Sequence, residues 1–399
     1  MILILRFFPN VLLSLAALFF TNQLQAKPLQ VYILAGQSNM QGHAKISTFE
    51  HIGMDPATKP MLADMLGPDG KPKVCERVWI SSIGCSGDDT TEQTGKLSAG
   101  FGAATEKIGP EFTFGLYMEK STDAPILLIK TSWGGKSLNT DFRPPSAGPY
   151  TFSETQLADL QKKGKDIATM KADKEKETGV YYRLMIEHVK KVIGDIKRVA
   201  PEYDAAQGYE LAGFAWFQGW NDLVDQGTYP NRDKPGGYDA YSTTMAHFIR
   251  DVRKDLNAPK MPFAIGVLGV GGPSVPSDKP DHKLNLRSAM AAPTLLPEFK
   301  GNVAAVMTEK YWDLELDAAC AKRDKIKQQA KKPTAKGKKA AAVEDKAALD
   351  KLLAEGLSDR ERLVIEKGVS NQGYHYLGSA KILGSIGKGL AESMIQLKK

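Results

Sequence analysis

Cysteine is scarce in this chain, which has three cysteines in 399 residues. Cys75, Cys85 and Cys320 are too few for a scaffold held together by disulfides. Cys75 and Cys85 are near enough in sequence to bridge a local loop in an oxidising compartment, and their spacing leaves that question open. No cluster of cysteine and histidine has the spacing of metal ligands, so the sequence gives no sign of a metal site.

Long apolar runs are missing after the first 26 residues. Those residues contain Arg6 near the start, an apolar run over 11–20 and a small residue, Ala26, at the end. This layout is typical of a secretory signal peptide cleaved after Ala26. An uncleaved membrane anchor is the alternative, but the run is short for a membrane span. We therefore expect residues 27–399 to be secreted or periplasmic, with no membrane span after cleavage.

A net positive charge is missing from most of the chain, although the formal total is +7. The segment 322–339 holds nine basic residues and one acid, which is a net of +8. Without Arg6 the total is +6, so the remainder of the mature chain is near −2. A nucleic-acid partner is not expected on that ground. Alanine, lysine and acids dominate from about 318 to 369, which predicts a charged insert of two helices joined by a flexible basic linker.

Five apolar segments rich in β-forming residues predict the strands of a sheet. Amphipathic patterns between them predict helices at about 110–119, 181–199 and 241–256, with a closing helix after residue 380. The predicted strands cover 31–35, 126–129, 211–217, 261–270 and 302–308. Strands that alternate with helices indicate a parallel sheet between two helical layers.

Residues suited to catalysis follow three of these strands where each strand ends. Ser38 lies in the sequence GQSNM, Gly134 and Gly135 in WGGKS, and Asn221 in QGWND. Chemistry in open α/β sheets sits at the carboxyl ends of strands, so we expect these residues to lie together. A serine there can act as a nucleophile if a histidine accepts its proton, although serine also favours helix N-caps. The glycine pair suits an oxyanion hole and, equally, a tight turn.

A fourth segment, GYHYLG at 373–378, carries His375 just before the closing helix. The four blocks GQSNM, WGGKS, QGWND and GYHY, in this order, resemble those of the SGNH hydrolases. The closest similarity is to the sialate O-acetylesterase-like (SASA) carbohydrate esterases, over nearly all of the mature chain except the lysine-rich insert. The resemblance implies a flavodoxin-like three-layer α/β/α sandwich with a central parallel sheet, and one esterase domain over 27–399. It implies no metal and no other cofactor.

The resemblance also implies roles for individual residues. Ser38 matches the nucleophile, His375 its base, Gly135 a backbone donor to the oxyanion and Asn221 a side-chain donor. Trp220 stands where many members have glutamate, so contacts to the sugar are expected to differ there. Four neighbouring polar side chains are expected to contact the substrate: Gln37, Asn39, Gln218 and Asp222.

The expected function is release of acetate from an acetylated carbohydrate. Two alternatives use the same fold: a carbohydrate-binding protein without catalysis, and a cell-envelope interaction protein that works through its basic segment. The intact pair of Ser38 and His375 favours the esterase. The motifs specify neither the sugar nor an oligomeric state.

The motifs leave open which group orients His375. SGNH enzymes usually carry an aspartate three residues before the histidine, and that position is Gln372 here. Gln372 could present its side-chain oxygen to the ring, as an asparagine does in papain-like proteases. Glu309 or Asp313, after the fifth strand, could instead reach the ring through the fold. The third hypothesis is a dyad of serine and histidine held by a backbone carbonyl.

Overall fold

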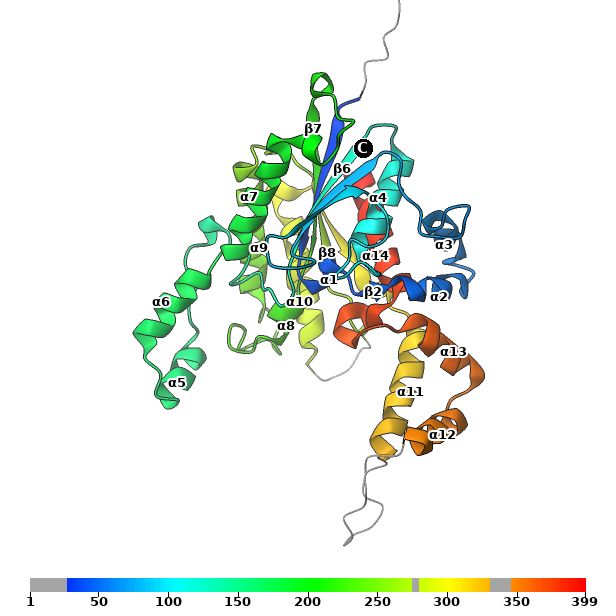
Figure 1. Ribbon diagram of the computed structural model, residues 1–399. Coiled ribbons are helices and arrows are strands. Elements are labelled where there is room, and N and C mark those ends of the chain that lie inside the picture. The colour runs from blue at the N-terminus through cyan, green and yellow to red at the C-terminus, as the bar shows by residue number, and fades with distance from the viewer. Residues whose placement is uncertain (1–26, 275–279, 331–345) are drawn as a thin grey trace, which may run out of the picture.

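The computed structural model describes residues 27–274, 280–330 and 346–399 (Figure 1). Its centre is a seven-stranded sheet with the order β4-β3-β6-β1-β7-β8-β9. Neighbouring strands are parallel except β3 and β4, which are antiparallel. The bounds are β1 Leu29–Gly36, β3 Val78–Ile83, β4 Glu92–Lys96, β6 Ile126–Ser132, β7 Tyr209–Phe217, β8 Phe263–Val267 and β9 Val303–Met307. The α/β class and the five strands predicted from the sequence are confirmed.

Strand β1 lies in the middle of the sheet and is buried along its whole length. It pairs with β6 on one side and β7 on the other, and the chain adds further strands outward in both directions. A strand covered on both faces needs a continuous apolar run, which explains why VYILA could be recognised from the sequence. The reversal of strand order at β1 makes its carboxyl end a natural site for ligands.

Helices cover both faces of the sheet and complete three layers (Figure 1). On one face α4, Pro110–Ser121, packs against α14, Ala380–Leu397. On the other face lie α7, Val180–Gly194, and α9, Asp239–Asp255, with α10, His282–Ala291, beside α9. Apolar side chains recur on one side of α14 and are buried, which is the amphipathic pattern that the sequence predicted.

The sequence analysis missed elements whose residues are mostly polar. Strand β4 reads EQTGK and pairs only at the edge of the sheet, where polar residues are tolerated. Helices α5, Glu154–Lys162, and α6, Ile167–Glu177, bury no residue and begin at capping side chains instead. Two short helices, α2 at Phe49–Gly53 and α3 at Lys59–Met65, were not predicted either.

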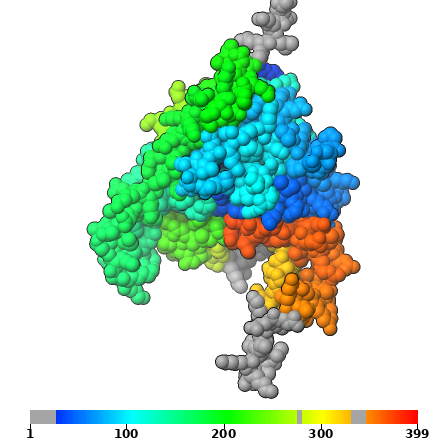
Figure 2. Space-filling view, viewed as in Figure 1, coloured from blue at the N-terminus to red at the C-terminus, as the bar shows by residue number. Residues whose placement is uncertain are grey.

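The charged insert forms helices that project from the body on the side opposite to α5 and α6 (Figures 1 and 2). They are α11, Leu314–Ala330, α12, Lys346–Gly356, and α13, Asp359–Gly368, with α11 packed against both others. The predicted basic linker at 331–339 and the predicted signal peptide lie outside the described residues.

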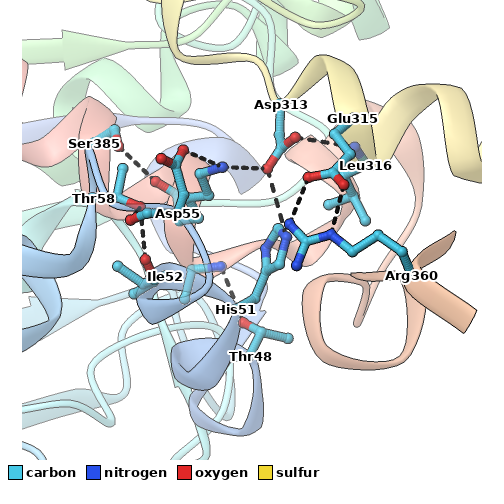
Figure 3. Close-up of polar contacts among 12 residues, drawn as sticks. Thr48, His51, Ile52, Asp55, Thr58, Asp313, Glu315, Leu316, Arg360 and Ser385 are labelled. Atoms are coloured by element: carbon cyan, nitrogen blue, oxygen red, sulfur yellow. Dashed lines mark hydrogen bonds and ion pairs between the residues drawn. The ribbon is translucent and has the colours of Figure 1, made fainter. Parts of the chain in front are cut away.

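A buried ionic cluster fixes the base of this insert to the core (Figure 3). Asp313 accepts hydrogen bonds from Lys381 of α14 at 2.8 Å and from the Leu316 backbone at 3.0 Å. His51 of α2 lies 3.6 Å from the same carboxylate, and both side chains are almost fully buried. One carboxylate therefore links three helices.

Cys75, Cys85 and Cys320 are free and buried, so no disulfide joins the first two. In the described part of the chain, no helix is both long and apolar enough to cross a membrane. Over the same residues, no group of three or more histidine, cysteine or acidic side chains is arranged to hold a metal ion.

Candidate active site

The register of the central strands brings three turns to one edge of the sheet. Gly36, at the end of β1, pairs with Ser132 of β6 and with Phe217 of β7. The three strands therefore end at the same level. The turns that carry Ser38, Gly135 and Asn221 therefore leave the sheet side by side. Two short helices lie at this end of the strands: α1, Ser38–Gln41, and α8, Trp220–Val224 (Figure 1).

Gly36 allows the close approach that this edge requires. A Cβ at this position would lie 2.1 Å from the carbonyl oxygen of Phe217, which is closer than any side chain tolerates. The chain turns directly from here into α1, Ser38–Gln41, so Ser38 stands at the start of a short helix. Its side chain is 7% exposed.

Helix α1 is held from below by a buried ion pair. The Lys130 ammonium donates to the carbonyl of Gln41 at 2.7 Å and to the Glu111 carboxylate at 2.8 Å. Lys130 and Glu111 are both fully buried. Removing one member of such a pair typically costs about 3–5 kcal/mol, so this contact fixes the helix that carries Ser38.

Three hydrogen-bond donors at this edge have no protein acceptor among the described residues: the backbone N–H groups of Ser38 and Gly135 and the Asn221 side-chain amide. Gly135 has φ +74°, in the left-handed region that favours glycine. The Gln37 side-chain oxygen accepts the N–H groups of Gly219 at 3.0 Å and Asn221 at 3.4 Å. Gln37 therefore ties the turn after β7 to the turn after β1.

His375 lies in the 3-10 segment η8, Gly373–Gly378, which packs against α1. Its Nδ1 lies 2.9 Å from the side-chain oxygen of Asn371. An amide oxygen can only accept, so this contact places the proton on Nδ1 and leaves Nε2 free to act as a base. Within the described chain, no hydrogen bond joins Ser38 to His375.

The Nδ1–H of the His375 ring donates to Asn371, and Gln372, the orienting residue suggested by the sequence, is not among the described hydrogen-bond partners of the ring. The Gln372 side chain is exposed, and its backbone carbonyl accepts the N–H of His375 at 3.0 Å. Asp313 is held by Lys381 in the cluster of Figure 3. Neither Asp313 nor Glu309 is among the described hydrogen-bond partners of His375.

The loop after His375 holds two residues in a strained conformation. Tyr376 has φ 53° and Leu377 has φ 60°, which cost of order 1–3 kcal/mol each for residues with a side chain. Tyr376 is fully buried, and its hydroxyl accepts the Gly269 N–H at 2.8 Å and lies 3.1 Å from the Thr308 hydroxyl. This anchor explains how the strained loop is kept in place.

Four aromatic rings contact one another at residues 370–378, the histidine loop. Trp220 stacks on Tyr374 with centroids 5.7 Å apart, and Tyr374 meets the edge of His375 at 4.4 Å. On its other face, His375 stacks on His43 at 4.0 Å with an interplanar angle of 3°. The sequence analysis missed His43 and Asn371, because no local pattern distinguishes either residue from an ordinary loop residue.

Comparison with known proteins identifies the family of this chain. Residues 28–310 match the family described as carbohydrate esterase, sialic acid-specific acetylesterase. The chain belongs to this family. It is therefore an ester-hydrolysing enzyme, and the predicted resemblance to the SASA carbohydrate esterases is confirmed. No curated protein matches the chain.

Solved structures with detectable similarity are distant. A protein from Arabidopsis thaliana is 17% identical with a TM-score of 0.39, over 70% of this chain and 86% of its own. A carbohydrate acetylesterase from Xanthomonas citri is 14% identical with a TM-score of 0.39, over 69% of this chain and 49% of its own. NanS is 13% identical with a TM-score of 0.38, over 70% of this chain and 78% of its own.

In this esterase, two of the predicted substrate contacts, Asp222 and Gln218, are buried among protein partners. Asp222 is fully buried and accepts the N–H groups of Leu138 at 2.8 Å and Asn139 at 3.2 Å. It also accepts from the Tyr229 hydroxyl at 2.8 Å and from Gln218 at 2.6 Å. Burial raises the pKa of Asp222 to about 6. These side chains fix the loop after β6 that carries the glycine pair.

Gln37 and Asn39 are also buried, with 0% and 2% of their surfaces exposed. Gln37 accepts hydrogen bonds from the turn that carries Asn221 and so supports that turn. Its contact with the substrate stays a prediction. The Asn39 amide has no hydrogen-bond partner among the described residues.

The electrostatic surroundings keep the histidine neutral. Burial and the nearby Lys107 ammonium lower the pKa of His375 to about 4. Lys107 belongs to β5, Lys107–Ile108, which pairs with β2, Ala44–Lys45. The imidazole is therefore in its basic form over the neutral and mildly acidic range.

We expect Asn371→Ala to lower the kcat for hydrolysis of p-nitrophenyl acetate by about tenfold or more, because the ring loses the acceptor that fixes its tautomer. Gln372→Ala should stay within about twofold of wild type. As a control, Asp313→Asn should lower the melting temperature and leave kcat within a few-fold, since its carboxylate binds Lys381. A loss of about 10³-fold in Asp313→Asn or Glu309→Gln would instead identify that acid as the partner of His375.

Proposed function

We propose that this carbohydrate esterase is a serine-dependent O-acetylesterase of the SGNH type, which releases acetate from acetylated sugars. One observation carries the proposal. Strands β1, β6 and β7 end at one level, so the turns that follow them bring Ser38, Gly135 and Asn221 together. The loop with His375 packs against α1, the helix that begins at Ser38. This arrangement offers a hydroxyl, a base and three free donors within one edge of the sheet.

The reaction proceeds through an acetyl-enzyme. His375 accepts the Ser38 proton at Nε2, and the serine oxygen forms a bond to the acetyl carbonyl carbon. The tetrahedral intermediate collapses when the bond to the sugar oxygen breaks, and the imidazolium returns its proton to that oxygen. Water, deprotonated by His375, then attacks the acetyl-enzyme and releases acetate and the free serine.

The intermediate places a negative charge on the former carbonyl oxygen. The N–H groups of Ser38 and Gly135 and the amide of Asn221 are the donors that this oxygen would meet. They come from three different turns, and each turn is fixed before substrate binds. Fixed donors need no reorganisation at the moment of reaction, and each is worth roughly 3–4 kcal/mol in a well-studied protease.

Ser38→Ala should abolish acetate release and labelling by a fluorophosphonate, because the nucleophile is gone. The melting temperature should change little, since the short side chain has no described hydrogen bond. Acetate release can be followed on acetylated sugars and on p-nitrophenyl acetate. Wild-type turnover by the mutant would overturn serine dependence, and inactive wild-type protein would favour a protein that only binds carbohydrate.

Asn221→Ala should lower kcat by about 10²–10³-fold with little change in KM, because its amide acts on the charge that forms in the transition state. Asn231→Ala, at an exposed asparagine in the following loop, is the control and should behave as wild type. An effect confined to KM would make Asn221 a ground-state contact to the sugar.

The acid limb of kcat/KM should fall at about pH 4, where His375 becomes protonated, and not near its ordinary pKa of about 6.5. Lys107→Met removes a cation that disfavours the imidazolium, so it should move this limb to higher pH. Lys197→Met, on an exposed lysine, should leave it unchanged. A limb that does not respond to Lys107→Met would exclude Lys107 as a cause.

We also propose that residues 1–26 are a signal peptide removed on export. N-terminal sequencing of the exported protein should then begin at Lys27. Recovery of only the full-length chain from the cytosol would contradict this.

A further inference from the structure

His43 lies directly against the proposed catalytic base. It follows α1 and precedes β2, and its ring is parallel to the ring of His375 at a centroid distance of 4.0 Å. Both ring nitrogens of His43 are buried without a hydrogen-bond partner among the described residues. Buried polar atoms without partners cost free energy, so this imidazole is not explained by hydrogen bonding. Instead, the face of the His43 ring contacts the ring of His375.

His375 has a specific need for such a contact. When it takes the proton of Ser38 it becomes an imidazolium, and a serine hydrolase normally stabilises that cation with a carboxylate. The described partner of Nδ1 here is the neutral amide of Asn371. Replacing the carboxylate by an amide costs about 10⁴ in kcat in a serine protease, and a second group that favours the cation would offset part of such a loss. The negative face of a neutral aromatic ring attracts a cation that lies over it.

The charges around His43 keep it in the neutral form that this role requires. Lys107 of β5 acts on it from one side, directly opposite Lys45 in the two-stranded ladder. Lys130 of β6 acts on it as well, with its own charge paired to Glu111. Burial, then His375 and these two lysines lower the pKa of His43 to about 3. Two stacked histidines would repel each other if both were charged, and here His43 stays uncharged.

The two rings are also held in register through the backbone. The Ser370 hydroxyl accepts the N–H of Lys45 at 3.0 Å and contacts the carbonyls of His43 at 3.3 Å and Gly378 at 2.7 Å. Ser370 therefore links the segment of His43 to both ends of the histidine loop. On its other side, the His375 ring is bounded by the ring of Tyr374.

We propose that His43 is a positioning residue for catalysis, whose ring face fixes the imidazole of His375 and stabilises its imidazolium in place of the missing carboxylate. This inference rests on the proposed function, since it needs His375 to act as the base. The ring, and not its nitrogens, carries the effect.

The test compares three replacements of His43 in the full-length mature enzyme. His43→Phe keeps a flat ring, whereas His43→Leu and His43→Met keep apolar bulk without one. His282→Leu, at a partly exposed histidine on α10, is the control. We expect kcat to fall by about tenfold in the Leu and Met variants, with KM unchanged, and to stay within about threefold of wild type in the Phe variant. An NMR titration of the His375 ring should give a lower pKa in the Leu and Met variants than in wild type and the Phe variant.

Other outcomes overturn the proposal. Unchanged kcat in the Leu and Met variants, with only a lower melting temperature, would mean that His43 merely fills space. A loss in the Phe variant as large as in the Leu variant would mean that the nitrogens act. If one apolar variant does not fold, the other gives the comparison. The titration does not depend on turnover, so an unchanged His375 pKa rejects the stack even if the wild-type protein proves not to be a serine esterase.

Discussion

Parallel pairing of β1 with β6 and β7 is the constraint on which the site depends. Gly36, Ser132 and Phe217 occupy one row of the sheet, so the turns that follow must leave it together. The approach is so close that only glycine fits at the end of β1, where a Cβ would meet the Phe217 carbonyl. A shift of register by one residue would turn the side chains of each strand to the opposite face. The burial of β1 on both sides makes such a shift costly.

Buried polar groups fix the positions of the turns at the carboxyl ends of these strands. Asp222 accepts two backbone N–H groups of the loop after β6, and Gln37 accepts two from the turn after β7. Lys130 holds the end of α1 while it pairs with Glu111. Such groups are costly to bury and stabilise only when their hydrogen bonds are satisfied. Asp222 and Gln37 belong to motifs near the proposed nucleophile whose polar residues suggest contact with a substrate. Their hydrogen bonds to neighbouring turns give a structural reason for polar residues at these positions.

The histidine loop is built differently from the serine turn. It carries two consecutive residues in left-handed conformation, anchored by the buried Tyr376, and its amide Asn371 binds the ring where related enzymes are expected to have a carboxylate. Rings on both sides bound the imidazole, with His43 on its face and Tyr374 at its edge. The anchored loop and the ring contacts thus bear on the orientation of the His375 ring, which in related enzymes is expected to come from an ion pair with a carboxylate. Burial and a positive neighbour, Lys107, act in the opposite direction and lower the pKa of His375.

The sequence by itself determined five strands of the parallel sheet, their alternation with helices, and the four blocks that resemble an esterase. These signals are local, since a buried parallel strand is an apolar run and its end is marked by glycine and polar residues. It did not reveal α5 and α6, whose caps and polar surfaces leave no apolar pattern. It also could not assign partners to individual side chains.

Only the tertiary structure decided those partners, because a hydrogen bond depends on distance in space and not on spacing in the chain. The N–H groups of Ser370 and Asn371 both bind the carbonyl of Leu377, which folds the loop back and brings Asn371, not Gln372, to His375. Asp313 instead accepts a hydrogen bond from Lys381 of α14. His43 meets His375 across more than three hundred residues of chain, through two loops that touch only in the folded protein.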